Sequence, residues 1–110
     1  MAYRHDIVIE KGASLALEID CRDEDGSPLA LTGCTAAAQV RHRHADGSPA
    51  AVFLAQVDAP EGRIRLSLQA GQTAALGKPQ GVWDCALTWP DATVQRLVEG
   101  RVAITPEVTR

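Results

Sequence analysis

Aromatic residues are scarce in this sequence, which has two tryptophans, one tyrosine and one phenylalanine. A core must therefore be built on alanine, valine, leucine and isoleucine, and apolar residues as a whole make up an ordinary 45% of the chain. No apolar run approaches the roughly 18 residues of a membrane-spanning helix. Because no apolar stretch of signal-peptide length follows the first residues, we expect the protein in the cytoplasm unless a particle carries it out.

A strong charge of either sign is also missing. The net charge of −3 gives no excess of lysine and arginine, which argues against nucleic acid and anionic membrane as partners. The cysteines Cys21, Cys34 and Cys85 are an odd number without close paired spacing, which favours free core thiols in a reducing compartment. The alternative is a disulfide between Cys21 and Cys85, on strands comparable to those joined in antibody domains.

The sequence contains no recognisable catalytic apparatus. The glycine–serine pairs Gly26-Ser27 and Gly47-Ser48 are each followed by proline and lack the second glycine of a nucleophile elbow. No glycine-rich phosphate loop followed by lysine occurs, and no pair of carboxylates stands out. We therefore predict that the chain is not an enzyme, has no catalytic residues, and takes neither a small-molecule substrate nor a cofactor.

Two clusters raise the question of a metal ion. The first consists of the carboxylates before Gly26, namely Asp20, Asp23, Glu24 and Asp25. With Gly26 as the sixth residue of an EF-hand loop, the first and twelfth places fall on Cys21 and Thr32, and the motif fails at both ends. The second cluster is His42 and His44, but zinc needs three or four ligands. We predict no metal site, an acidic hairpin tip, and histidines on a solvated edge strand.

The dominant pattern is an alternation of apolar and polar residues, which is typical of half-buried strands. It predicts strands, two of them weakly patterned, over residues 6–10, 15–22, 36–43, 51–57, 63–69, 82–89 and 98–104. The turns 25–28 and 46–49 are both Asp-Gly-Ser-Pro, in which glycine supplies a positive φ. Residues 70–76, with Gly77 and Pro79 behind them, predict one or two helical turns with Leu76 under the sheet.

About seven short strands separated by turns predict an all-β fold. This pattern favours an immunoglobulin-like two-sheet β-sandwich with one short helical turn. A small β-barrel is the alternative. The 110 residues suit a single β-sandwich domain, residues 1–110.

The sequence contains two candidate interface regions. Trp83 and Trp89 share one face of a predicted strand, and we place Trp83 in the core. Trp89 directly precedes a Pro90-Asp91 turn, so it is expected at the rim of the sandwich, where it can anchor a partner. The other candidate is the polar tail, which has nothing obvious to pack against in its own chain: Pro106, Glu107, Val108, Thr109 and Arg110.

The order of several sequence phrases carries a resemblance that covers nearly the whole chain. The phrases lie at 12–17, 23–28, 31–36 (LTGCTA), 62–68, 72–76, 81–84, 97–102 and 105–110 (TPEVTR). In this order they resemble a family of small bacteriophage and prophage tail proteins. The chain is also similar to the N-terminal immunoglobulin-like domain of phage baseplate upper proteins. Cys34 and Trp83 stand where this family commonly has tyrosine.

The resemblance implies a structural component of a phage or prophage tail particle of the baseplate type. Such a component acts by protein–protein docking without catalysis, in the bacterial cytoplasm during assembly and in the virion afterwards. The implied partners are phage tail or baseplate proteins and a second copy of the chain itself. A β-sandwich module that binds carbohydrate or a host surface is the alternative, although such sites usually expose several aromatic residues.

Overall fold

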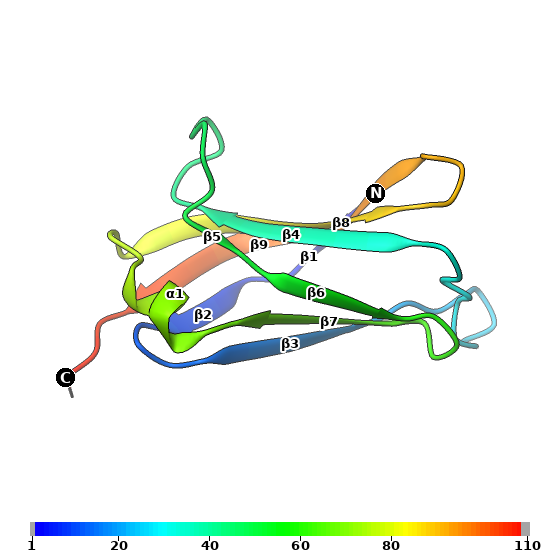
Figure 1. The fold of residues 1–110 in the computed structure, drawn as a ribbon, viewed down its shortest axis with the longest axis horizontal. Coiled ribbons are helices and arrows are strands. Elements are labelled where there is room, and N and C mark those ends of the chain that lie inside the picture. Colours follow the sequence, from blue (N-terminus) through cyan, green and yellow to red (C-terminus); the bar gives the residue numbers. More distant parts are fainter. Residues whose placement is uncertain (1, 109–110) are drawn as a thin grey trace.

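The chain folds into two β-sheets and one short helix over residues 2–108, the part that the computed structural model describes (Figure 1). The larger sheet has the order β1 (Tyr3–Arg4), β9 (Val94–Thr105), β8 (Gln80–Thr88), β4 (Thr35–Arg41) and β5 (Ala51–Val52), with β2 (Ile7–Glu10) also paired to β9. The smaller sheet has the order β3 (Leu15–Asp20), β7 (Arg63–Leu68) and β6 (Leu54–Asp58). The helix α1 (Ala70–Ala74) follows β7.

This arrangement confirms the predicted β-sandwich. The strands β3, β7 and β6 form one sheet, and β4, β8 and β9 form the centre of the other, which is how the B, E, D and C, F, G strands of immunoglobulin domains divide. The first strands differ from the constant-type pattern, because β1 and β2 pair in parallel with β9 instead of with β3. The two sheets do not close on each other, so the barrel alternative is wrong.

The core is aliphatic, as the scarcity of aromatic residues predicts. Alternate residues of β7 point inward, and Ile64, Leu66 and Leu68 are at most 2% exposed. Trp83 is the core tryptophan, as predicted, and packs against Phe53 with ring centroids 6.1 Å apart. Burial of such side chains contributes roughly 1.5–3 kcal/mol each and is the main force that joins the two sheets.

The predicted strand at residues 51–57 is divided between the two sheets. β5 pairs with β4 of the larger sheet, and β6 pairs with β7 of the smaller sheet. Phe53 lies at the crossing, where its side chain is buried and its N–H donates to the carbonyl of Ala38 over 3.0 Å. The aromatic side chain therefore fills the space between the sheets at the point where the backbone passes from one to the other.

The N-terminal strand is also divided, between β1 and β2. At the break, the carbonyl oxygen of His5 accepts a hydrogen bond of 2.8 Å from the buried indole N–H of Trp83. The His5 carbonyl lies against Gly100 of β9, and a Cβ at that position would overlap it. Because Gly100 has no side chain, the N-terminal segment can lie close enough to β9 for the His5 carbonyl to accept the indole N–H, the only polar group in the Trp83 side chain.

The helix and the turn between β2 and β3 are joined by one buried hydroxyl group. Thr73 is completely buried, and its Oγ1 accepts from the N–H of Gly12 over 3.0 Å and donates to the carbonyl of Ala13 over 2.9 Å. Leu76 is 1% exposed, as predicted for the residue under the sheet. Within residues 2–108, no helix is long and apolar enough to cross a membrane.

Substitution of Thr73 by valine is expected to lower the free energy of unfolding by about 1–3 kcal/mol, because the Gly12 N–H then loses its partner in a buried place. Thr35, which is exposed on β4, is the matched control, and its change to valine is expected to cost less than about 0.5 kcal/mol. Urea denaturation of the two variants measures both values. Equal stability of the two variants would contradict the role given to Thr73.

Candidate functional site

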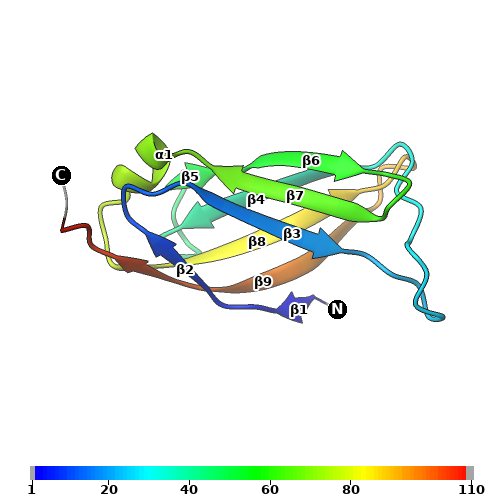
Figure 2. The same ribbon diagram turned by 90° about the horizontal axis from the view of Figure 1, so that it is seen from below.

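A cleft of about 660 Å³ lies between the two sheets, on the side formed by β3 of the smaller sheet and by β1 and β9 of the larger sheet. Figure 2 shows the ribbons of these three strands. Its lining is mostly apolar, and its three charged residues are exposed. The lining residues are Ala2, Tyr3, Ile19, Asp20, Cys21, Arg22, Asp23, Leu29, Trp89, Gln95, Leu97 and Val98. The cleft exists because no strand among residues 2–108 joins β3 to β9 along this side.

Leu97 lines the cleft because β9 contains a β-bulge. Val98 is opposite Cys85 and Arg96 is opposite Ala86, so Leu97 is the additional residue between them. A bulge interrupts the alternation of faces and redirects a side chain. Leu97 is therefore half-buried against the cleft next to the fully inward Val98, instead of pointing out into solvent with Arg96.

The cleft brings together the two aromatic side chains that lie outside the core. Tyr3 is 81% exposed, and Trp89 is half-buried with its indole N–H 3.3 Å from Oε1 of Gln95. The prediction for Trp89 is confirmed in its position, at the rim of the sandwich beside a turn. Tyrosine and tryptophan with one apolar side toward a cleft and a polar atom toward water are common anchors in protein interfaces.

A tight turn fixes Trp89 in place. The N–H of Trp89 donates to the carbonyl of Thr93 over 2.8 Å, and the N–H of Ala92 donates to the carbonyl of Trp89 over 2.9 Å. Ala92 has a φ of 72°, a left-handed conformation that is unusual for alanine. The Asp91 carboxylate accepts hydrogen bonds from the side chain and the N–H of Thr93, which lower the pKa of Asp91. Trp89 is thus held by a turn with several internal restraints.

The C-terminal tail lies at the opposite end of the sandwich from the β8–β9 turn that contains Trp89 (Figure 1). Pro106 and Val108 are exposed, but the Glu107 side chain packs against the backbone of Gly12. The expectation that the tail has nothing to contact in its own chain is therefore wrong for Glu107. Thr109 and Arg110 lie outside the described residues. The tail and the β8–β9 turn that contains Trp89 are thus separated along the longest axis of the molecule, which extends 44 Å.

The histidines do not share a strand face. β4 ends at Arg41, and His42 lies in the following loop, where its Nδ1 is 2.9 Å from the carbonyl oxygen of Gln80. The predicted pair on an edge strand is wrong because β4 ends two residues before its sequence pattern does and lies between β8 and β5. No group of three or more histidine, cysteine, aspartate or glutamate residues in the part of the chain that is described could hold a metal ion.

The acidic residues before Gly26 have a structural role in their own turn. Oδ1 of Asp23 accepts from the N–H of Asp25 over 3.2 Å and from the N–H of Ser27 over 3.1 Å. This is the local side-chain-to-backbone pattern by which aspartate stabilises turns. The predicted hairpin tip is found where expected, and all three carboxylates from Asp23 to Asp25 are exposed.

The cysteines are free in the structure and differ in their surroundings. Cys34 and Cys85 are buried, as predicted, whereas Cys21 is half-buried and lines the cleft. Burial, followed by the charges of Cys21 and Asp84, raises the pKa of the Cys85 thiol to about 12. Burial, followed by the charge of Asp20, also raises the pKa of Cys21. Neither thiol has the lowered pKa of a nucleophilic cysteine.

Sequence reasoning located Trp89 but not the other residues of the cleft. Tyr3 reaches the cleft because β1 pairs in parallel with β9. The local sequence pattern of a strand does not indicate that strands near the two ends of the chain pair with each other. Leu97 did have a signal, because two consecutive apolar residues, Leu97 and Val98, interrupt the alternation of a strand and indicate a bulge. Comparison of the sequence with models of protein families and with curated proteins found no match.

Proposed function

We propose that the chain is a structural component of a phage or prophage tail particle of the baseplate type, and that it docks to a neighbouring tail protein without catalysis. The observation that carries the docking role is the apolar cleft with Tyr3 and Trp89 at its mouth. The assignment to a phage or prophage tail particle is based on the sequence segments that resemble phage tail proteins. On this proposal the protein assembles in the bacterial cytoplasm and leaves the cell in the virion.

The cleft has the features of a protein-docking site. Its volume of about 660 Å³ accommodates several apolar side chains of a partner segment. Most of its lining is apolar, and its charged lining residues Asp20, Arg22 and Asp23 are exposed, a combination that resembles the apolar centre and polar rim of protein interfaces. The internally restrained turn around Trp89 lowers the entropy cost of binding, because the anchor is already ordered.

One observation favours a second candidate, a carbohydrate-binding module. Tyr3 and Trp89 line the same cleft, and exposed aromatic rings are the surfaces on which sugar rings stack. A titration of host-surface oligosaccharides, followed through the fluorescence of Trp89, separates the two candidates. A saturable change that is lost in Trp89→Ala supports sugar binding, and no change at millimolar oligosaccharide supports protein docking.

The proposed function predicts that the chain is present in purified particles and that the cleft recruits it. In the bacterium that encodes the chain, Tyr3→Ser and Leu97→Asp are expected to reduce the copies per particle at least tenfold. Leu54→Asp is the matched control, because Leu54 is 63% exposed on β6 and outside the cleft, and it is expected to leave incorporation unchanged. Quantitative mass spectrometry of gradient-purified particles provides the measurement.

Deletion of residues 106–110 tests the tail separately from the cleft. If the tail contributes to docking, the deletion reduces incorporation while the melting temperature falls by only a few degrees, since the deletion removes the contact of the Glu107 side chain with Gly12 but no core residue. Thermal denaturation of Tyr3→Ser shows whether a loss of incorporation reflects folding instead. Absence of the wild-type chain from particles, or normal incorporation of Tyr3→Ser together with Leu97→Asp, would refute the proposed function.

A further inference from the structure

A second concave surface lies on the outer face of the larger sheet, away from the cleft. Its volume is about 420 Å³, and its charged and polar lining includes Arg4, Gln39, Arg41, His44, Asp84, Arg96, Glu99 and Arg101. In Figure 1 the loop between β4 and β5 rises above this face at one end, and the β8–β9 hairpin bends upward at the other. We call this surface, around β4, β8 and β9, the arginine face.

The strand register arranges the arginine face in rows. Arg41 of β4 is opposite Val82 of β8, and Val82 is opposite Arg101 of β9. The two guanidinium-bearing residues are therefore two strand spacings apart, about 10 Å, with one apolar side chain between them. In the neighbouring row, Asp84 of β8 is opposite Glu99 of β9.

The ion pairs on this face leave two cations without an ionic partner. Nε of Arg96 is 3.4 Å from Oδ2 of Asp84, and its Nη1 is 3.6 Å from Oε2 of Glu99. Arg96 therefore offsets part of the negative charge of both carboxylates. Arg4 is paired with Asp6 at 3.6 Å. Arg41 and Arg101 form no ion pair with any residue from 2 to 108 that the structure describes.

Arg41 is held in position by neutral groups. Its Nη1 donates to the carbonyl of Asp46 over 2.6 Å, and its Nη2 donates to Oε1 of Gln39 over 3.0 Å. These bonds fix the guanidinium plane and use only two of its five N–H groups. A partner carboxylate can therefore bind to a preordered donor, which reduces the entropy cost that weakens most surface ion pairs.

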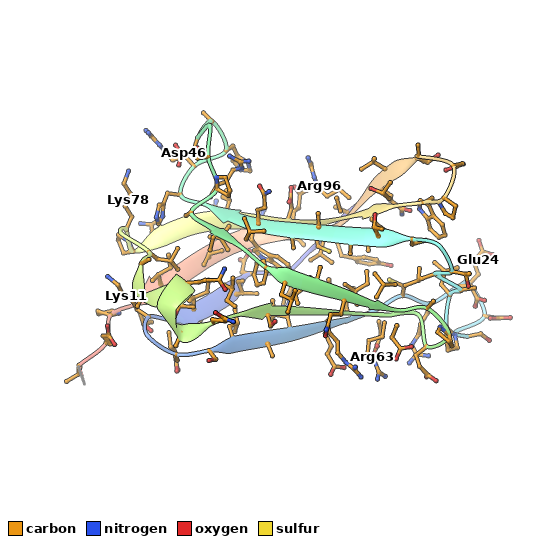
Figure 3. The ribbon with its side chains drawn as sticks, viewed as in Figure 1. Lys11, Glu24, Asp46, Arg63, Lys78 and Arg96 are labelled. Carbon is orange, nitrogen blue, oxygen red and sulfur yellow. The ribbon has the colours of Figure 1, made fainter. Side chains whose placement is uncertain are left out.

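The same chain carries an acidic group of matching character on a different part of its surface. The tip formed by Asp23, Glu24 and Asp25 is exposed, and Glu24 lies at one end of the long axis, whereas Arg96 lies on the upper face (Figure 3). The two surfaces of one molecule therefore point in different directions. They can meet only between two copies of the chain.

We propose that the arginine face binds the acidic tip, residues 23–25, of a second copy of this chain. The contact is heterologous, since it joins two different surfaces: one copy uses its face and keeps its tip free, and the other uses its tip and keeps its face free for the next copy. Such contacts generate rings or open chains of subunits. The inference uses a surface separate from the cleft and does not depend on the proposed function.

The contact is expected to be weak in free solution and strongly dependent on salt. Exposed ion pairs contribute about 0–1 kcal/mol each, so a few of them give dissociation constants near the millimolar range unless other contacts add to them. Salt at about 1 M shortens the Debye length to roughly 3 Å and removes most of this attraction. A method that reports weak association residue by residue is therefore required.

A dilution series of ¹⁵N-labelled protein at low salt, followed by two-dimensional NMR, provides that method. On dilution, the amide signals of the arginine face and those of residues 22–27 are expected to shift together, and the shifts are expected to vanish at about 1 M salt. Shifts on only one of the two surfaces, shifts that persist at high salt, or no shifts up to millimolar protein would overturn the proposal.

Charge-reversal variants test whether the two surfaces meet. Arg41→Glu/Arg101→Glu reverses the charge of the two unpaired arginines of the face. Glu24→Lys/Asp25→Asn removes the net negative charge of the tip, while the amide oxygen of Asn keeps the acceptor that the Ser27 N–H uses. Each variant alone is expected to lose the concentration-dependent shifts. An equimolar mixture of the two is expected to regain them, because the native tip of one variant meets the native face of the other.

Two further variants keep the test decisive. Arg101→Glu alone changes an exposed side chain and is expected to weaken the shifts without unfolding the protein, even if the double face variant is unstable. Arg65→Glu places the same charge change on the outer face of the smaller sheet and is expected to leave the shifts intact. Failure of the mixture to regain the shifts, or equal loss in Arg65→Glu, would overturn the proposal.

Discussion

Replacement of Gly100 by alanine is expected to lower the free energy of unfolding by about 2–4 kcal/mol. A Cβ at this position would overlap the carbonyl oxygen of His5, so the segment between β1 and β2 must move away from β9. The same carbonyl accepts the indole N–H of Trp83 over 2.8 Å, and Trp83 is only 4% exposed. The substitution thus adds a steric clash and leaves a buried donor without its partner.

Gly47→Ala is the matched control for Gly100→Ala. A Cβ at Gly47 meets no atom within 4 Å, and this change is expected to alter stability by less than about 0.5 kcal/mol. Urea denaturation measures both variants. A second comparison uses a chain that lacks residues 1–5: if the His5 carbonyl is the cause, Gly100→Ala should cost much less in the shortened chain than in the full chain. An equal cost in both would contradict the explanation.

The sequence predicts most of the strands and their inner faces because the signal for them is local. In β7, the alternation over residues 63–69 identifies Ile64, Leu66 and Leu68, and all three are buried. Burial on one face of a strand imposes a period of two in the sequence without reference to any distant residue. The short helix was predictable for the same reason, since the stop signal Gly77 and Pro79 is local, although α1 itself ends earlier, at Ala74 with Ala75 as its C-cap.

What the sequence does not reveal is which strands become neighbours. Tyr3 and Leu97 approach the same cleft only because β1 pairs in parallel with β9, and this pairing joins opposite ends of the chain. The arginine face likewise combines Arg41 and Arg101 through β8, which lies between their strands. Alternation states which face a side chain occupies, but it does not state which other side chains share that face.

The cleft and the arginine face would give one protein two ways to make contacts. The cleft is apolar and suits a contact that persists at high salt, since burial of apolar surface is little affected by ionic strength. The arginine face is polar and suits a contact that salt weakens. A salt series applied to particles and to isolated protein therefore distinguishes docking through the cleft from self-association through the arginine face.

The Cys85 thiol is expected to react with a thiol reagent about a thousandfold more slowly in the folded protein than in the unfolded chain at pH 8. Its pKa is raised to about 12 by burial, together with the nearby charges of Cys21 and Asp84, and only the thiolate is nucleophilic. Cys21 is half-buried in the cleft and is expected to react first. Mass spectrometry of a timed alkylation gives the order. Recovery of only one reactive thiol after denaturation without reductant would instead show a disulfide.

The same raised pKa makes stability depend on alkaline pH. Above the ordinary cysteine pKa of about 8.5 the unfolded chain loses the Cys85 proton, whereas the folded protein keeps it until the pH approaches about 12. The unfolded state therefore binds fewer protons in this window, and the stability contribution present below about pH 8.5 is lost as the pH rises toward 12. Cys85→Ala removes this titration while leaving that of every other group in place. The free energy of unfolding of the wild type is therefore expected to fall more steeply between pH 8.5 and 11 than that of Cys85→Ala, and parallel pH profiles would contradict the raised pKa.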